Sequence, residues 1–223
     1  MFVEKNANSL PHNWLLHHFY ISSLKKNAGH LHGKVLDLGC GRKPFHKIIE
    51  KHCDRYFGLE YPTTLHGLEY VDVVGSALVL PFLSDSVDTV VSFSVLEHVP
   101  EPQQFLVEAF RVLKPGGKAL LMTPLMWGEH EPPHDYFRFT RFGLRYLAEK
   151  VSFEVISIEP DTGYWSTAVL RFNYSLNRLA RGPLQYLMRP LWWDQYLALW
   201  LDKLDRKYRV DTATYTTILR KPV

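Results

Sequence analysis

The sequence predicts an α/β fold in which a doubly wound, mainly parallel sheet carries helices on both faces, with an α-helical insertion before the last strand. Short β-rich apolar runs alternate with amphipathic helical segments over residues 34–158, which is typical of parallel sheets. The first run ends in a loop containing Gly39 and Gly41, as at strand-to-helix turns that approach a ligand closely. The chain has 223 residues, 46% of them hydrophobic, which is enough for one well-filled domain.

The first half of the chain supplies a complete βαβ unit and its neighbours. The expected elements are, in order, a helix at 13–26, a strand at 34–38, a helix at 44–51, strands at 55–59, 70–74 and 86–93, a helix at 102–112 and a strand at 117–123. Pro44 has the fixed φ that suits the first turn of a helix. The segment Lys114-Pro115-Gly116-Gly117 predicts a turn that ends one helix and begins the next strand.

The second half is looser and richer in aromatic residues. A long loop follows residue 123, and a helix at 141–150 and a strand at 153–158 come after it. Two or three helices are expected over 164–207, broken by Gly182-Pro183 and Pro190, and an antiparallel strand at 212–219 lies at the sheet edge or beside it. We expect a single domain over 1–223, with a helical cap (1–32), a cofactor-binding core (33–160), a helical insertion (161–210) and a final strand (211–223).

Charge and cysteine content disfavour several classes of protein. The net charge of +3 arises from mixed signs rather than a basic tract, so no nucleic-acid partner is expected. The two cysteines, Cys40 and Cys53, lack Cys-x-x-Cys spacing, which argues against a disulfide framework or a zinc knuckle. The first residues show no signal-peptide pattern, and a cytoplasmic location is expected.

The loop at 35–44 predicts a nucleotide-type site. Asp37, Gly39 and Gly41 form its core, but Pro44 replaces the last glycine of the dinucleotide fingerprint, so a dinucleotide is the weaker interpretation. Glu60 ends the second strand about 20 residues later, where a carboxylate can accept hydrogen bonds from ribose hydroxyls. This spacing strengthens the interpretation as a nucleoside site.

Four segments also carry a resemblance to a known family. They are Val35 to Pro44, Gly75 to Phe82, Val87 to Val99 and Leu113 to Gly117. In order and spacing they resemble the class I S-adenosylmethionine-dependent methyltransferases of the type-11 group, over roughly residues 33–160. The resemblance implies a Rossmann-like fold, S-adenosylmethionine as cofactor and S-adenosylhomocysteine as product.

The resemblance also implies the cofactor-binding residues. The glycine loop, with Asp37, Gly39, Cys40 and Gly41, passes under the methionine part of the cofactor; Glu60 lies at the ribose, Ser76 and Ala77 at the adenine, and Phe93 and Ser94 near the methionine. Tyr61 and His98 are further cofactor-binding candidates, and in the family the histidine of Leu96-Glu97-His98 often packs or forms a hydrogen bond. Two positions depart from the family pattern, because Lys43 replaces a common third glycine and Ser76 replaces the acid that receives the adenine amino group. A neutral hydroxyl is expected to bind that group more weakly than a carboxylate.

The loop after the fifth strand is the richest source of acceptor-site candidates, since substrates of such sheets bind there. His134 is a candidate general base, Asp135 can orient it, and Tyr136 or Arg138 can bind the acceptor. The alternatives are that His134 and Asp135 are a structural staple and that Arg138 pairs with Asp135 as an internal tie. No metal is expected: the literal His130-Glu131-Pro132-Pro133-His134 matches a zinc-protease pattern, but that pattern requires a helix and adjacent prolines forbid one.

The predicted function is methyl transfer to a small molecule, with oxygen as the preferred acceptor atom and a saccharide or lipid-linked intermediate as possible substrates. The alternative is a catalytically silent cofactor-binding subunit that docks a partner or membrane through its aromatic C-terminal helices. Residues 183–204 are the candidate surface for peripheral membrane contact or a homodimer, although charged residues within them argue against a membrane span.

Overall fold

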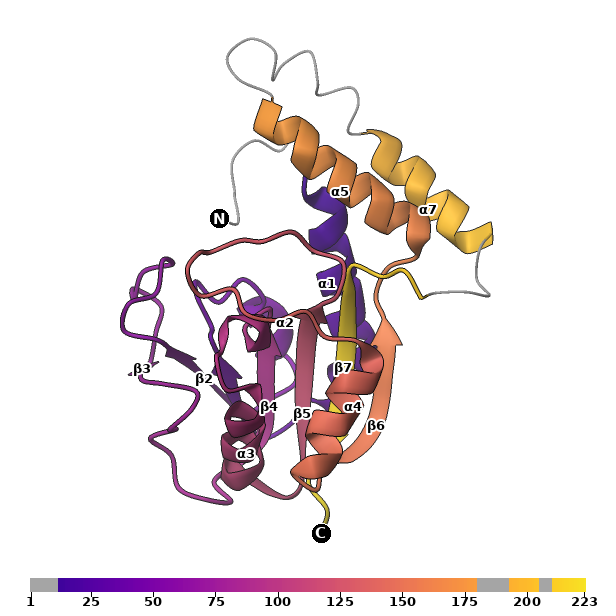
Figure 1. The fold of residues 1–223 in the computed structure, drawn as a ribbon. Helices are drawn as coiled ribbons and strands as arrows, with labels where there is room; N and C mark the ends of the chain where they lie inside the picture. The colour runs from indigo at the N-terminus through magenta and orange to yellow at the C-terminus, as the bar shows by residue number, and fades with distance from the viewer. Residues whose placement is uncertain (1–11, 180–192, 205–209) are drawn as a thin grey trace.

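The computed structural model describes residues 12–179, 193–204 and 210–223, and its seven strands form one sheet in the order β3-β2-β1-β4-β5-β7-β6 (Figure 1). The strands are β1 (Lys34–Leu38), β2 (Arg55–Glu60), β3 (Val73–Val74), β4 (Val87–Phe93), β5 (Leu113–Pro124), β6 (Glu154–Pro160) and β7 (Thr214–Arg220). Strands β1 to β5 pair in parallel, whereas β7 is antiparallel to both β5 and β6. The predicted doubly wound, mainly parallel sheet is confirmed.

Helices cover both faces of the sheet. Successive strand residues point to opposite sides, and apolar side chains on each side pack against helices. The helices are α1 (Trp14–Asn27), α2 (His46–Ile49), α3 (Pro102–Val112), α4 (Arg141–Lys150), α5 (Tyr164–Leu179) and α7 (Asp194–Leu204). In β1, Leu36 and Leu38 pack in the core under α3 and α4, while Val35 packs in the core under α1 and α2. This alternation leaves Asp37 buried on the α1 and α2 side.

Helices α5 and α7 pack against each other beyond the end of the sheet (Figure 1). Asp202 of α7 joins them, because its buried carboxylate accepts hydrogen bonds from the N–H groups of Gly163, Trp165 and Ser166 at the start of α5. A residue from a distant helix therefore caps α5. Residues 180–192 and 205–209 lie outside the described residues, including the predicted breaks at Gly182-Pro183 and Pro190.

Four expectations about the elements need correction. Helix α2 covers only 46–49 instead of 44–51, because Lys43 has a positive φ and Pro44 lies in the turn that follows it. The strand expected at 70–74 is reduced to two residues, and the expected turn at 114–117 belongs to β5, which shifts register there against β4. Strand β7 lies inside the sheet, between β5 and β6, and β6 forms the edge on that side. No helix among the described residues is long and apolar enough to cross a membrane.

Candidate functional site

The glycine loop lies at the carboxyl end of β1 and is fixed to the neighbouring strand. The N–H groups of Gly39 and Cys40 donate to the carbonyl of Leu59, at 2.9 and 3.1 Å. Gly39 and Gly41 have φ values of +75° and +51°, a backbone region that residues with a Cβ rarely adopt. A Cβ on Gly41 would meet nothing closer than 3.8 Å, so the loop leaves open space on that side.

Glu60 connects the glycine loop to the segment predicted to hold adenine. Its carboxylate accepts hydrogen bonds from the N–H of Gly41 at 2.8 Å and from the N–H of Tyr61 at 2.9 Å. Its main-chain carbonyl accepts from the N–H of Gly75 at 3.0 Å, which places Ser76 and Ala77 beside it in the chain. Each carboxylate oxygen retains acceptor capacity for a ligand hydroxyl.

The side chains of Asp37 and Cys40 in this loop are buried. The Tyr56 hydroxyl donates to Oδ2 of Asp37, and Oδ1 has no hydrogen-bond partner among the described residues. Burial raises the pKa of Asp37 to about 7, the nearby Glu60 adds to this, and the bond from Tyr56 opposes it. Burial also raises the pKa of the Cys40 thiol to about 12, so this cysteine is an unreactive part of the loop.

The two positions that depart from the family pattern have local roles in the fold. The Ser76 hydroxyl accepts a hydrogen bond from the N–H of Leu78 at 3.1 Å and so closes its own turn. Lys43, with φ of +50°, pairs its ammonium with Asp72 and lies over the ring of Tyr56. The lysine therefore holds the loop against β2.

Phe93 and Ser94 lie at the carboxyl end of β4, facing the first helix. The Ser94 hydroxyl and the Tyr20 hydroxyl of α1 form a hydrogen bond, and the Phe93 and Phe45 rings lie 4.7 Å apart. The sequence did not predict Tyr20 as a site residue; the available signal was a tyrosine on the side of the N-terminal helix that is buried. Helix α1 thus contributes a polar group beside the predicted methionine position.

In the loop at 125–140, Asp135 pairs with Arg138 and not with the His134 ring. Its carboxylate accepts from both terminal nitrogens of Arg138, at 2.6 and 2.8 Å, and from the N–H of His130 at 2.9 Å. The Arg138 guanidinium holds the pKa of Asp135 well below its usual range. Arg138 also donates to the carbonyls of Trp127 and Gly128. The Asp135–Arg138 pair is therefore an internal ion pair of the loop, which was the alternative to a catalytic role for Asp135.

His134 is exposed, and its Nδ1 lies 3.1 Å from the Tyr136 hydroxyl. The Asp135 carboxylate is held by Arg138 and by the N–H of His130, whereas the His134 ring lies against Tyr136. The expected orientation of His134 by Asp135 is therefore absent, whereas His134 and Tyr136 remain together at the surface of the site. Residues 130–134 form no helix, as the prolines predicted.

His98 lies against the acceptor loop and not against the glycine loop. Its Nδ1 donates to the carbonyl of His134 at 2.7 Å, and its Nε2 lies 3.1 Å from Nε2 of His130. Glu97, which sequence reasoning passed over, is fully buried next to it, and burial raises the pKa of its carboxyl to about 8. Only its place directly before His98 offered a signal.

Two further contacts bring the acceptor loop over the carboxyl end of the sheet. His66 pairs with Glu131 at 3.2 Å, which raises the pKa of His66, and its side chain lies above Gly41. On the other side, the rings of Trp127 and Tyr174 of α5 lie 4.7 Å apart. The candidate site is thus bounded by the glycine loop, the acceptor loop and the helical insertion.

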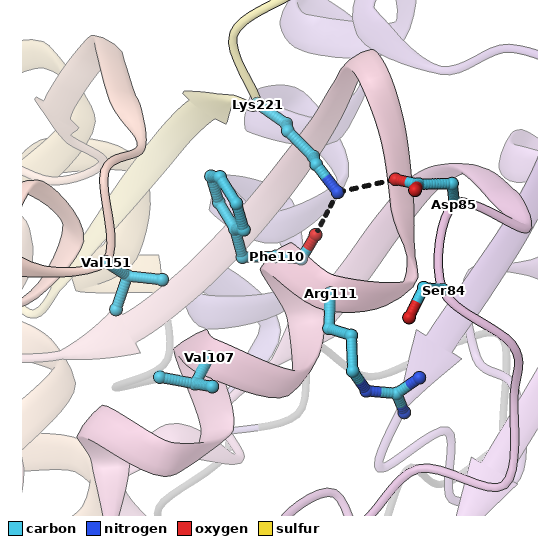
Figure 2. Close-up of a pocket in the computed structure, with 7 residues that line it drawn as sticks. All are labelled: Ser84, Asp85, Val107, Phe110, Arg111, Val151 and Lys221. Atoms are coloured by element: carbon cyan, nitrogen blue, oxygen red, sulfur yellow. Dashed lines mark hydrogen bonds and ion pairs between the residues drawn. The ribbon is translucent and has the colours of Figure 1, made fainter.

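An open hollow of about 500 Å³ lies elsewhere, at the opposite end of the sheet (Figure 2). Asp85 precedes β4, Phe110 and Arg111 precede β5, and Lys221 follows the antiparallel β7, so these residues mark the amino ends of the parallel strands. The Lys221 ammonium donates to Asp85 and to the carbonyls of Phe110 and Leu113, as Figure 2 shows in part. This hollow is separate from the candidate site.

Comparison with known proteins agrees with this geometry. Residues 36–121 match the family model described as a methyltransferase domain, which spans the glycine loop, Glu60 and Glu97. This segment resembles a methyltransferase domain. A relative from Mycolicibacterium smegmatis, named "Probable S-adenosylmethionine-dependent methyltransferase", is 41% identical over 96 residues, which cover 40% of this chain and 37% of the relative. The chain therefore spans less than two fifths of that relative's length.

Solved structures share the fold of this chain over nearly its whole length. The [4+2]-cyclase SpnF superposes with a TM-score of 0.65 at 18% identity, covering 100% of this chain and 86% of the other. Phosphoethanolamine N-methyltransferase 2 of Haemonchus contortus, in complex with S-adenosylmethionine, gives a TM-score of 0.61 at 17% identity, covering 95% of this chain and 56% of the other. At these identities the likeness shows a class I methyltransferase fold and nothing finer.

Proposed function

We propose that the protein transfers a methyl group from S-adenosylmethionine to a small-molecule acceptor, at the carboxyl end of β1, β4 and β5. The observation that carries the proposal is the placement of Glu60, whose carboxylate binds the glycine loop while its carbonyl holds the segment at Ser76. In open α/β sheets, ligands bind outside the carboxyl ends of the strands where the strand order reverses. The reversal lies between β1 and β4, beside this carboxylate.

The residues present fit this cofactor. The open side of Gly41 allows close approach to the backbone, and the Glu60 carboxylate has acceptor capacity left for two hydroxyls of a ribose. Asp37, Cys40 and Tyr61 support the loop and its neighbour, and Ala77, Phe93 and Ser94 line the adjoining strand ends. When bound, the cofactor supplies a methyl group already activated by its sulfonium.

We propose oxygen as the acceptor atom, because a hydroxyl nucleophile needs a group that takes its proton and the site offers one. His134 is exposed in the acceptor loop beside Tyr136, whose hydroxyl lies within hydrogen-bond distance of the imidazole. His134 would take the hydroxyl proton as the acceptor oxygen receives the methyl group, which the bound cofactor would supply from its sulfonium. Arg138 and Asp135 position the loop that carries both residues.

Calorimetric titration with S-adenosylmethionine and S-adenosylhomocysteine tests cofactor binding. Glu60→Gln keeps the size of the side chain and removes its charge, so loss of the charge-assisted hydrogen bonds is expected to weaken binding about 10- to 100-fold. Glu50→Gln, at an exposed glutamate, is the matched control and is expected to bind as wild type. Folded protein that binds neither compound would contradict the proposal.

Transfer of a labelled methyl group tests the acceptor chemistry. We expect label from methyl-tritiated cofactor to enter an O-methyl product in a small-molecule or lipid extract. His134→Ala is expected to lower kcat while leaving the cofactor Kd unchanged. Equal loss of both would identify His134 as structural, and label in an N-methyl product would overturn oxygen as the acceptor.

A second candidate function is a catalytically silent subunit that docks a partner or membrane. Helix α7 favours it, because Leu197, Trp200 and Leu204 lie at helical spacing and are all more than half exposed, as is Trp193 before the helix. The remaining residues of the candidate surface, 183–192, lie outside the described residues. Cofactor binding without methyl transfer to any extract would favour this function.

A further inference from the structure

Three donor atoms from Glu97, His98 and His130 converge between β4 and the acceptor loop. Nε2 of His98 lies 3.1 Å from Nε2 of His130 and 3.9 Å from Oε1 of Glu97, and all three ligand atoms lie within 4.8 Å of one another. Glu97 and His98 belong to the short 3-10 helix Leu96–His98 after β4, whereas His130 lies 32 residues further along the chain.

The two imidazoles are held so that their Nε2 lone pairs face each other. Nδ1 of His98 lies 2.7 Å from the carbonyl of His134, and Nδ1 of His130 lies 3.1 Å from the carbonyl of Gly128. Carbonyl oxygens only accept, so both Nδ1 atoms carry the proton in the neutral rings, and neither Nε2 can donate to the other. The Asp135 carboxylate, 3.9 and 3.5 Å from the same Nδ1 atoms, favours this tautomer. Arg138 is further from Nδ1 of His130, at 3.4 Å, and already donates to Gly128 and Asp135.

Glu97 brings a buried carboxylate to the same point. Its side chain is 0% exposed, and neither of its oxygens has a hydrogen-bond partner among the described residues. Its backbone is fixed, because the Glu97 carbonyl accepts from the N–H groups of Tyr136 and Phe137. A buried carboxylate without partners is costly unless a cation or a donor compensates it.

We propose that Glu97, His98 and His130 bind one first-row divalent cation, of which Zn²⁺ is the best match. With Zn–N bonds of about 2.0–2.1 Å, the observed separation of the two Nε2 atoms corresponds to an N–Zn–N angle of about 100°, close to tetrahedral. The Glu97 carboxylate, with Oε1 3.9 Å from Nε2 of His98, would complete the set after an inward movement of about 1 Å. Two histidines and one glutamate are a known set of ligands for catalytic zinc. A ligating imidazole is held in the right orientation when its other nitrogen donates a hydrogen bond to a carbonyl, as both histidines do here.

This set differs from the zinc-protease pattern at residues 130–134. His134 contributes only its main-chain carbonyl, which orients His98, and the prolines between the two histidines place Glu131 against His66. The ligands instead come from two carboxyl-end segments of the sheet. The pairing was not visible in the sequence because His98 and His130 meet only when β4 and β5 lie side by side.

Three protein ligands leave a coordination position for an exogenous oxygen. Because a bound cation lowers the pKa of a coordinated hydroxyl, it would assist deprotonation of an acceptor beside His134 and Tyr136. This second step rests on the proposed methyl transfer. Binding of the cation rests on the three side chains alone.

Titration of tag-free, chelator-treated protein with Co²⁺ and Zn²⁺, without cofactor or acceptor, tests the site. We expect one equivalent to bind with a Kd in the micromolar range or below, and Co²⁺ to give the visible absorption of a low-coordinate site. His98→Gln and His130→Gln are each expected to weaken binding at least 100-fold, and Glu97→Gln about tenfold or more. Circular dichroism and thermal unfolding verify that each variant is folded.

A double variant at His17 and His18 is the matched control, because these histidines of α1 are an alternative place for a metal to bind. Binding that is unchanged in the control and lost in the three site variants supports the site. No binding tighter than about 100 μM by folded protein, or binding that survives in His98→Gln and His130→Gln, overturns it. Loss of methyl transfer on chelation supports the acceptor step, and undiminished transfer by metal-free protein overturns that step alone.

Discussion

Replacing Gly39 by alanine is expected to destabilise the protein by about 2–5 kcal/mol. The backbone at Gly39 has φ of +75°, where a residue with a Cβ costs about 1–2 kcal/mol. The new Cβ would also lie 2.4 Å from Cγ2 of Val95 and 2.9 Å from Cγ1, and overpacking of this kind costs about 1–3 kcal/mol. Both atoms belong to one side chain, so the packing part of the loss is assignable to a single partner.

Gly41 provides a control within the same loop. Its φ is +51°, but an added Cβ meets His66 no closer than 3.8 Å, so Gly41→Ala carries only the backbone cost of about 1–2 kcal/mol. Urea unfolding monitored by circular dichroism gives the free energy of unfolding for both variants. Val95→Ala removes the two clashing carbons, and the Gly39→Ala loss measured in that background is expected to fall to the value found for Gly41→Ala.

Two results would refute this reasoning. Equal destabilisation by Gly39→Ala and Gly41→Ala would show that the Val95 contact has no energetic weight. A double-mutant cycle with a coupling energy below about 0.5 kcal/mol would show the same by an independent route.

Three other predictions concern charges and caps. Because burial raises the folded-state pKa of Asp37 to about 7, the folded protein binds more protons than the unfolded chain between about pH 4 and pH 7. The free energy of unfolding should therefore fall by up to about 4 kcal/mol as the pH rises through this window. Urea titrations at a series of pH values measure this slope, and Asp37→Asn should remove the part that is due to Asp37. Asp202→Ala should lower the free energy of unfolding by about 2–3 kcal/mol, since three N–H groups at the start of α5 lose a charged acceptor. Lys203→Ala, at an exposed neighbour, should change it by no more than about 0.5 kcal/mol, and equal effects of the two substitutions would contradict the capping role. Ser76→Asp should tighten S-adenosylmethionine binding about fivefold in calorimetry, because an acid at this position gives the adenine amino group a charge-assisted partner, and weaker binding in the folded variant would place adenine elsewhere.

Local pattern was sufficient for the elements with strong periodicity. The helix predicted at 102–112 and the helix predicted at 141–150 have those bounds in the structure, since each combines an apolar stripe with a clear start or stop. The helix expected from Pro44 does not form because the preceding Lys43 has a positive φ, with its ammonium paired with Asp72 just before β3. The interior place of β7 is likewise set by pairing with β5 and β6, which its own residues do not encode.

The candidate site was predictable where one segment holds it and not where two segments meet. The glycine loop and Glu60 follow from spacing along the chain, and the structure joins them by a hydrogen bond. His134 and Asp135 suggested a pair because they are neighbours in sequence, yet the Asp135 carboxylate lies against Arg138. The tautomers of His130 and His98 are set by the carbonyls of Gly128 and His134. The positions of these carbonyls depend on how the loop folds, which a local sequence pattern does not predict.

The insertion of β7 between β5 and β6 also has a consequence for synthesis on the ribosome. Strand β4, which also pairs with β1, can pair with β5 soon after β5 is made, but the other edge of β5 waits for Thr214–Arg220, and β6 has no partner strand until then. An unpaired edge in a nascent chain is open to association with other chains. We therefore expect chaperone engagement and protease sensitivity to be greatest while the helical insertion is being translated, and to fall once β7 has emerged.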